Sequence, residues 1–178
     1  MKFVRHGNPK GLDIDYTVFV DSVEDIEHVH ETLKSNGLLF LYQRGDKPYD
    51  PESKSLIVLH YIDPHLKLYD YSFKFDDKAK PEDKPTSPHN AELDKAYAKA
   101  KKDPKFRSRL RKYMELHSLI HSFWKHLRAY GRLSDEHEHV LFKILKRIKK
   151  ETGEELTSAP SIESLQKLDS KIKHFFEV

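Results

Sequence analysis

Two aspartates, Asp13 and Asp15, stand where a glycine-rich turn enters a hydrophobic segment. On an extended chain, residues i and i+2 point to the same side, so both carboxylates would project from one face of a strand. Two neighbouring carboxylates repel each other unless a cation neutralises them. Mg²⁺ prefers one or two carboxylates completed by phosphate oxygens of a substrate. The pair therefore predicts a site for Mg²⁺ or Mn²⁺ together with a phosphate-bearing ligand.

The turn before this pair has residue types that suit phosphate binding. It reads Gly7-Asn8-Pro9-Lys10-Gly11, a dense run of turn-forming residues. Backbone N–H groups that such a turn exposes can bind a phosphate. We expect Gly7, Asn8, Lys10 and Gly11 to contact a nucleotide.

A third carboxylate on a neighbouring strand would complete a two-metal site. Asp70, within the β-rich segment of residues 66–75, is the first candidate. Asp63 is the second, although the Asp63-Pro64 pair is typical of a turn.

This pattern resembles the polymerase-β-like nucleotidyltransferase superfamily over residues 1–75. In that family a Gly-Ser turn precedes an Asp-x-Asp strand, and a helix and a strand with a third carboxylate follow. Small members and their phage-encoded relatives carry a helical lobe after the catalytic domain. The resemblance implies that Asp13, Asp15 and Asp70 are the catalytic metal ligands and that an NTP is the substrate. Two features depart from the family, since Asn8 stands in place of serine and only four residues separate it from Asp13.

The C-terminal half supports two other interpretations. Arg111 and His117 are separated by five residues, which resembles the Arg-x(4–6)-His motif of HEPN-type helical ribonucleases. In such an enzyme the histidine would exchange protons and the arginine would stabilise the phosphate. The other alternative is a non-catalytic module that binds nucleic acid or a protein partner through basic helices.

Charge is unevenly distributed along the chain. Residues 1–89 carry 12 Lys and Arg against 16 Asp and Glu, whereas residues 90–178 carry 20 against 13. A basic half attracts an anionic partner such as nucleic acid, and an acidic half suits a cation. The residues that we expect to contact nucleic acid are Arg107, Arg109, Arg111, Lys146, Arg147, Lys149 and Lys150.

Two histidine pairs have spacings that can bind a metal. They are His117 with His121 and His137 with His139. No carboxylate at a supporting spacing accompanies either pair in the sequence. We therefore interpret these side chains as ordinary surface or partly buried histidines.

Hydrophobic periodicity predicts an α+β fold with a sheet-rich first half. A helix is expected between its N-cap Ser22 and Gly37. Strands are predicted at residues 1–5, 15–20, 38–42, 55–62 and 66–75.

Four helices are predicted in the second half. Their expected bounds are 87–101, 103–130, 134–153 and 161–178, each starting at a capping residue. Trp124 and Tyr130, on the second of these helices, are interpreted as core residues rather than base-stacking platforms. The implied domains are a transferase-like domain at 1–76, a linker at 77–88 and a basic helical domain at 89–178.

Composition excludes several classes of protein. The chain has no cysteine, which rules out disulfides and zinc–thiolate sites within it. No apolar run approaches the roughly 20 residues that span a bilayer, and the N-terminal residues lack the apolar region of a signal peptide. We expect a cytoplasmic protein with no membrane partner.

Overall fold

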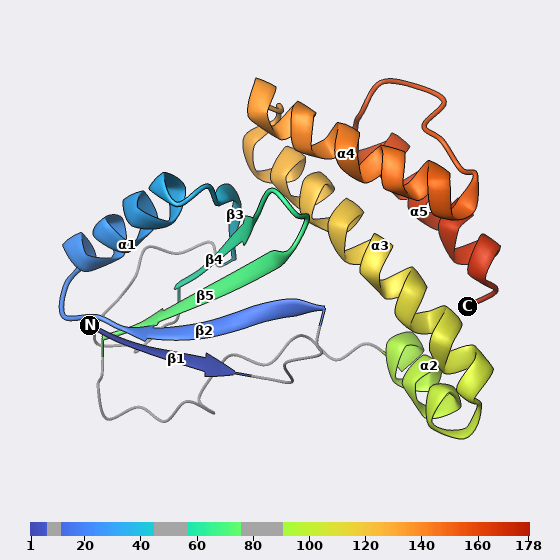
Figure 1. Cartoon of the computed structure of the whole chain (residues 1–178), viewed down its shortest axis with the longest axis horizontal. Helices are drawn as coiled ribbons and strands as arrows, with labels where there is room; N and C mark the ends of the chain where they lie inside the picture. The colour runs from blue at the N-terminus through green and yellow to red at the C-terminus, as the bar shows by residue number, and fades with distance from the viewer. Residues whose placement is uncertain (7–11, 45–56, 76–90) are drawn as a thin grey trace. The chain divides into compact units, whose positions relative to one another are not determined.

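The chain divides into two compact units in the computed structural model, Met1–Thr86 and Ser87–Val178. Residues 1–6, 12–44, 57–75 and 91–178 are described, without the side chains of residues 91–93. The first unit contains a five-stranded sheet and one helix, and the second is helical (Figure 1). The fold is therefore α+β, as the sequence predicts. The predicted linker at 77–88 lies outside the described residues.

The sheet is mixed and has the strand order β1-β2-β5-β4-β3. Its central strand, β5, pairs in parallel with β2 and antiparallel with β4, and the two outer pairs are antiparallel. The strands are β1 (Lys2–His6), β2 (Asp13–Phe19), β3 (Leu39–Arg44), β4 (Ile57–Ile62) and β5 (Leu68–Lys74). All five predicted strands are present, and their ends lie within two residues of the predicted ones.

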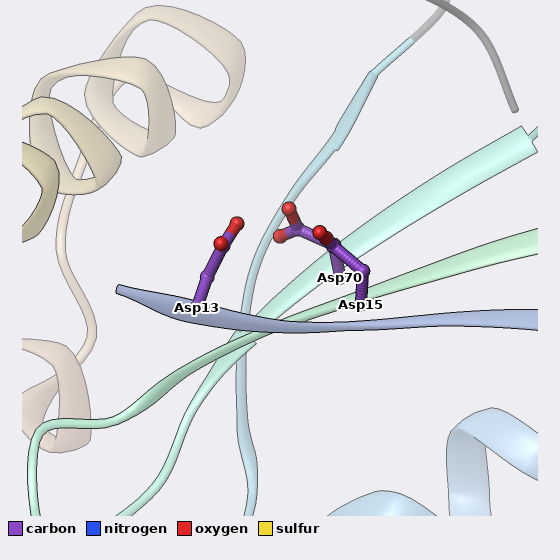
Figure 2. Close-up of side chains that lie close together, drawn as sticks. All are labelled: Asp13, Asp15 and Asp70. Atoms are coloured by element: carbon purple, nitrogen blue, oxygen red, sulfur yellow. The ribbon is translucent and has the colours of Figure 1, made fainter. Parts of the chain in front are cut away.

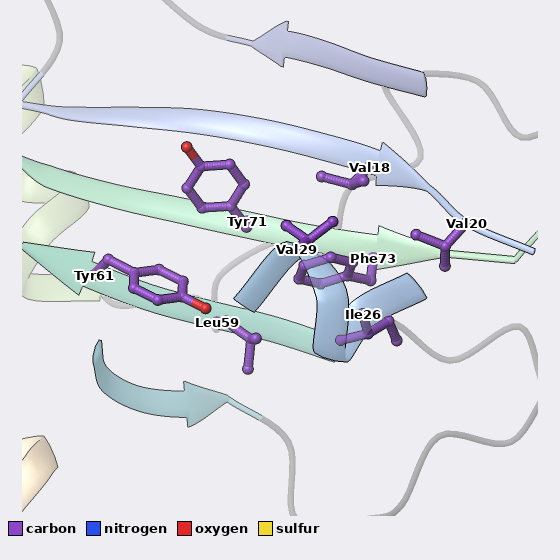
Figure 3. Packing of buried hydrophobic residues seen from close by; sticks show 8 residues of the cluster. All are labelled: Val18, Val20, Ile26, Val29, Leu59, Tyr61, Tyr71 and Phe73. Atoms are coloured by element: carbon purple, nitrogen blue, oxygen red, sulfur yellow. The ribbon is translucent and has the colours of Figure 1, made fainter. Parts of the chain in front are cut away.

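One face of the sheet is covered by α1 (Val23–Ser35) (Figure 1). The Ser22 side chain caps this helix by accepting a hydrogen bond from the Asp25 N–H. Ile26 and Val29 pack against the sheet, and His30 Nδ1 lies 2.7 Å from the Tyr61 hydroxyl. Figure 3 shows the resulting core, which consists of Val18, Val20, Ile26, Val29, Leu59, Tyr61, Tyr71 and Phe73. The side chains that alternate with these core residues along the strands point to the opposite face of the sheet.

The second unit is built around the long helix α3. Its helices are α2 (Ala91–Lys102), α3 (Pro104–Tyr130), α4 (Asp135–Thr152) and α5 (Ile162–Phe176), and α3 contacts the other three. Asp103 caps the start of α3, and Gly131 ends it with a φ of 75° that favours glycine. Trp124 is buried as expected, but the expectation for Tyr130 is wrong, because the last turn of α3 leaves that ring 49% exposed. The helices that the structure describes include none long and apolar enough to cross a membrane.

Candidate metal centre

Three carboxylates converge on the face of the sheet that α1 does not cover (Figure 2). Asp15 pairs directly with Asp70 in the parallel register of β2 and β5, and Asp13 lies two residues before Asp15 on the same face. One potential ligand atom from each residue lies within 4.8 Å of the other two. The structure thus brings together the three residues that the sequence singled out.

The strand pairing explains why these side chains meet. In a parallel pair, directly paired residues project to the same face, and successive residues alternate between faces. Ile14 and Tyr16 of β2 and Tyr69 and Tyr71 of β5 therefore point to the opposite face, where Tyr71 belongs to the core beneath α1. The same alternation that directs these side chains toward the α1 face gathers the aspartates on the other face.

His60 of β4 holds one side of the cluster. It pairs with Asp70 in the antiparallel register, and its Nδ1 lies 2.5 Å from Asp70 Oδ1. The Tyr42 ring stacks on the His60 ring, with centres 4.2 Å apart and planes 13° from parallel. Burial, and secondarily the negative charge of Asp70, raises the pKa of Tyr42 to about 12. The Asp70 carboxylate is thus held by the His60 imidazole on the neighbouring strand, and the Tyr42 ring stacks on that imidazole.

More polar side chains continue along this face. His6 on β1 pairs with Asp15, and its Nε2 lies 2.5 Å from Thr17 Oγ1. Thr17 pairs with Ser72, which is fully buried, and the Ser72 Oγ has no hydrogen-bond partner within the described residues. Burying such polar groups lowers stability unless each has a hydrogen-bond or charge partner, and an unsatisfied group such as the Ser72 Oγ calls for an explanation, of which a binding site is one.

The three carboxylates fit a hard divalent cation. Two oxygens on opposite sides of one Mg²⁺ ion lie about 4.2 Å apart, because each Mg–O distance is about 2.1 Å. The upper separation of 4.8 Å between the aspartate atoms is close to this value, so small side-chain rotations would satisfy one ion. Carboxylate oxygens are also suitable ligands for Mn²⁺.

The other residues that the sequence proposed for this site have different outcomes. Gly7, Asn8, Lys10 and Gly11, the expected phosphate-binding turn, lie outside the described residues. Asp63 is a turn residue, since its Oδ1 accepts hydrogen bonds of 2.9 Å from the N–H groups of His65 and Lys67. It is therefore not the third carboxylate.

Five of the seven basic residues expected to bind nucleic acid make hydrogen bonds or ion pairs inside the helical unit. Arg107 donates to the Ala100 and Lys101 carbonyls, and Arg109 donates to the Phe176 carbonyl. The remaining contacts are the ion pairs Arg111–Glu115, Arg147–Glu115, Arg147–Glu151 and Lys149–Glu155. Lys146 and Lys150 are exposed side chains of α4, and Lys146 lies over the exposed Phe142 ring.

The two residues of the pair proposed for a ribonuclease, Arg111 and His117, contact different carboxylates. The Arg111 side chain contacts Glu115, which also pairs with Arg147 on α4. His117 Nδ1 contacts Asp169 on α5 instead. Among the described residues, the contacts of this pair thus lead to Glu115 on α3 and to Asp169 on α5.

Sequence reasoning missed His60 and Tyr42. Both lie on strands whose existence the sequence predicted, but their alignment with Asp70 depends on which strands are neighbours. A shift in the register of β3 against β4, between Phe40 and Tyr42, brings the Tyr42 ring over His60. Such a bulge has no signal in the sequence of this strand.

Comparison of the chain with models of known families, with curated proteins and with solved structures gave no match.

Proposed function

We propose that the N-terminal unit is a metal-dependent nucleotidyltransferase that transfers a nucleotide from an NTP to an acceptor. The observation that carries this proposal is the convergence of Asp13, Asp15 and Asp70 from two adjacent parallel strands. An Asp-x-Asp strand and a third carboxylate on a neighbouring strand are the arrangement that the resemblance to this superfamily implies.

Each residue has a defined part in this proposal. Asp13, Asp15 and Asp70 would hold Mg²⁺ or Mn²⁺ through oxygen atoms. When bound, the cation would neutralise charge on the nucleotide phosphates during in-line displacement. His60 would keep one oxygen of Asp70 occupied, so that the other oxygen is directed toward the cation.

The helical unit would contribute to binding the acceptor. Lys146 and Lys150 offer exposed positive charge on α4, and surface ion pairs such as Arg147–Glu151 are weak enough to exchange for a phosphate. A nucleic-acid acceptor is consistent with this charge and with the net positive charge of the helical half.

The double substitution of Asp13→Asn and Asp15→Asn tests the proposal. It removes two negative charges and nearly keeps side-chain shape. The wild-type protein should gain thermal stability with Mg²⁺ or Mn²⁺, gain more with an NTP, and incorporate labelled nucleotide into RNA, DNA or protein acceptors. The double variant should lose all three responses, and without metal it should melt no lower than wild type, because a repulsion has been relieved.

A matched variant, Asp21→Asn together with Asp25→Asn, changes the same charge just before and within the first turn of α1, outside the cluster. It should keep the metal response. If the melting temperature of the wild-type protein does not change with millimolar Mg²⁺, Mn²⁺ or any of the four NTPs, the proposal is overturned and a binding module is favoured.

A further inference from the structure

A second group of polar side chains lies where α3 packs against α5. Asp169 on α5 accepts a 3.0 Å hydrogen bond from the Tyr113 hydroxyl, and its other carboxylate oxygen lies 2.9 Å from His117 Nδ1. The His117 and Asp169 side chains are 26% and 14% exposed. A neutral imidazole that donates its Nδ1–H to a carboxylate presents a lone pair at Nε2. Asp169 thereby prepares His117 to act as a ligand.

His121 lies one turn further along the same face of α3, and its ring centre is 5.4 Å from that of His117. Two imidazoles that share one tetrahedral ion, with metal–nitrogen bonds of about 2.0–2.1 Å, have ring centres roughly 5 Å apart. The two rings therefore already have the separation that a shared ion requires.

We propose that His117 and His121 bind a divalent transition-metal ion such as Zn²⁺, Ni²⁺ or Cu²⁺, with Asp169 orienting His117 from behind. Metal-binding histidines commonly donate their other N–H to a carboxylate in this way. Imidazole nitrogen selects these metals, whereas carboxylate oxygen suits Mg²⁺, so this site and the aspartate cluster differ in the ions they prefer. The inference is independent of the proposed transferase activity.

The remaining coordination positions stay open to water or to a ligand. Within the ranges that the structure describes, the only group of three potential ligands is the aspartate cluster. A metal held by two protein nitrogens keeps exchangeable positions, which is a property of sites that bind a substrate rather than of closed structural sites.

Trp124 provides a reporter inside this site. It is the single tryptophan of the chain, and its ring centre lies 5.7 Å from that of His117 and 5.0 Å from that of His121. Cu²⁺ and Ni²⁺ quench indole fluorescence at contact distances. Quenching of this one fluorophore therefore reports an ion bound close to Trp124, although the chain contains 12 histidines.

The experiment is a fluorescence titration of the full-length protein, without a polyhistidine tag, with Ni²⁺ and Cu²⁺. Saturable quenching that EDTA reverses is expected for wild type and for the Asp13→Asn, Asp15→Asn double variant. His121→Asn should abolish it, and this change leaves the Tyr113 and His117 contacts with Asp169 in place. Asp169→Asn should raise the apparent Kd by about 10–100-fold.

His139→Ala is the control, because it removes an exposed histidine from α4. It should titrate like wild type. The proposal is overturned if wild type shows no saturable quenching, or if folded His121→Asn protein, verified by circular dichroism, is quenched as strongly as wild type. The proposal is also overturned if the Asp13→Asn, Asp15→Asn double variant loses the quenching while the His121→Asn variant keeps it.

Discussion

At the scale of single residues, both candidate sites depend on a pairing between a histidine and an aspartate. His60 contacts Asp70 in the sheet unit, and His117 contacts Asp169 in the helical unit. In the first pair the carboxylate is the proposed ligand and the imidazole orients it. In the second the roles are reversed. In each pair, the proposed metal ligand is the residue that lies near the other proposed ligands of its site.

The role of His60 can be tested by His60→Ala. Without the imidazole, Asp70 can rotate, so the affinity for Mg²⁺ should fall by about 10–100-fold, as is typical when the partner of a metal ligand is removed. Isothermal titration calorimetry measures this change. Tyr42→Phe is the matched control, because it keeps an aromatic ring to stack on His60 and should change the affinity little. Equal affinities for His60→Ala and wild type would show that Asp70 needs no support.

At the scale of helices and strands, most boundaries follow from local chemistry. The sequence predicts Ser22, Asp103, Ser134 and Ser161 as capping residues, and each accepts a backbone hydrogen bond at the start of a helix. These signals are local, so the sequence predicts them well.

Asp103→Ala tests the strength of one such cap. The Asp103 carboxylate accepts from the N–H groups of Lys105 and Phe106, so its loss should lower the free energy of unfolding by about 1 kcal/mol. Urea unfolding followed by circular dichroism gives this value. Asp135→Ala, which removes a carboxylate from the first turn of α4 but not from its N-cap, should cost distinctly less. Equal losses in the free energy of unfolding for the two variants would contradict the predicted contribution of the Asp103 cap.

Pairings between distant segments are where sequence reasoning stops. Asp169 lies 52 residues from His117, so no spacing rule connects them, and the sequence alone gives the pair of His117 and His121 no carboxylate partner. His60 was missed for the same reason. Asp70 was found because period-2 alternation and a family pattern both pointed to it, although neither fixed the direct pairing of Asp15 with Asp70. Local sequence patterns predict helices and strands, whereas the pairing of distant segments in the fold decides which side chains contact one another.

At the scale of the whole molecule, the two halves differ in charge, and the positive half predicts salt-dependent binding of nucleic acid. Each phosphate that a cation neutralises releases counterions, so affinity should fall steeply as salt rises. Lys146→Glu together with Lys150→Glu should weaken binding without regard to sequence and should reduce the slope of log K against log salt by about 2.

Fluorescence anisotropy with labelled single strands and duplexes measures this slope. Lys171→Glu together with Lys173→Glu, an equal charge change at exposed positions of α5, is the comparison variant. An affinity that does not change with salt would contradict an electrostatic mode of binding. If instead both double variants lose affinity equally, the α4 lysines have no special part in the contact.

The strand order has a consequence for protein synthesis. β5 is the last strand to leave the ribosome, yet it lies between β2 and β4. Until it emerges, a nascent chain can form only the outer antiparallel pairs, and each of them exposes an unpaired edge that invites association with other chains. Asp70 arrives on that final strand, so the aspartate cluster and its contact with His60 come into being in the same step that closes the sheet. During translation, the proposed cation site therefore forms only when the described five-stranded sheet is complete.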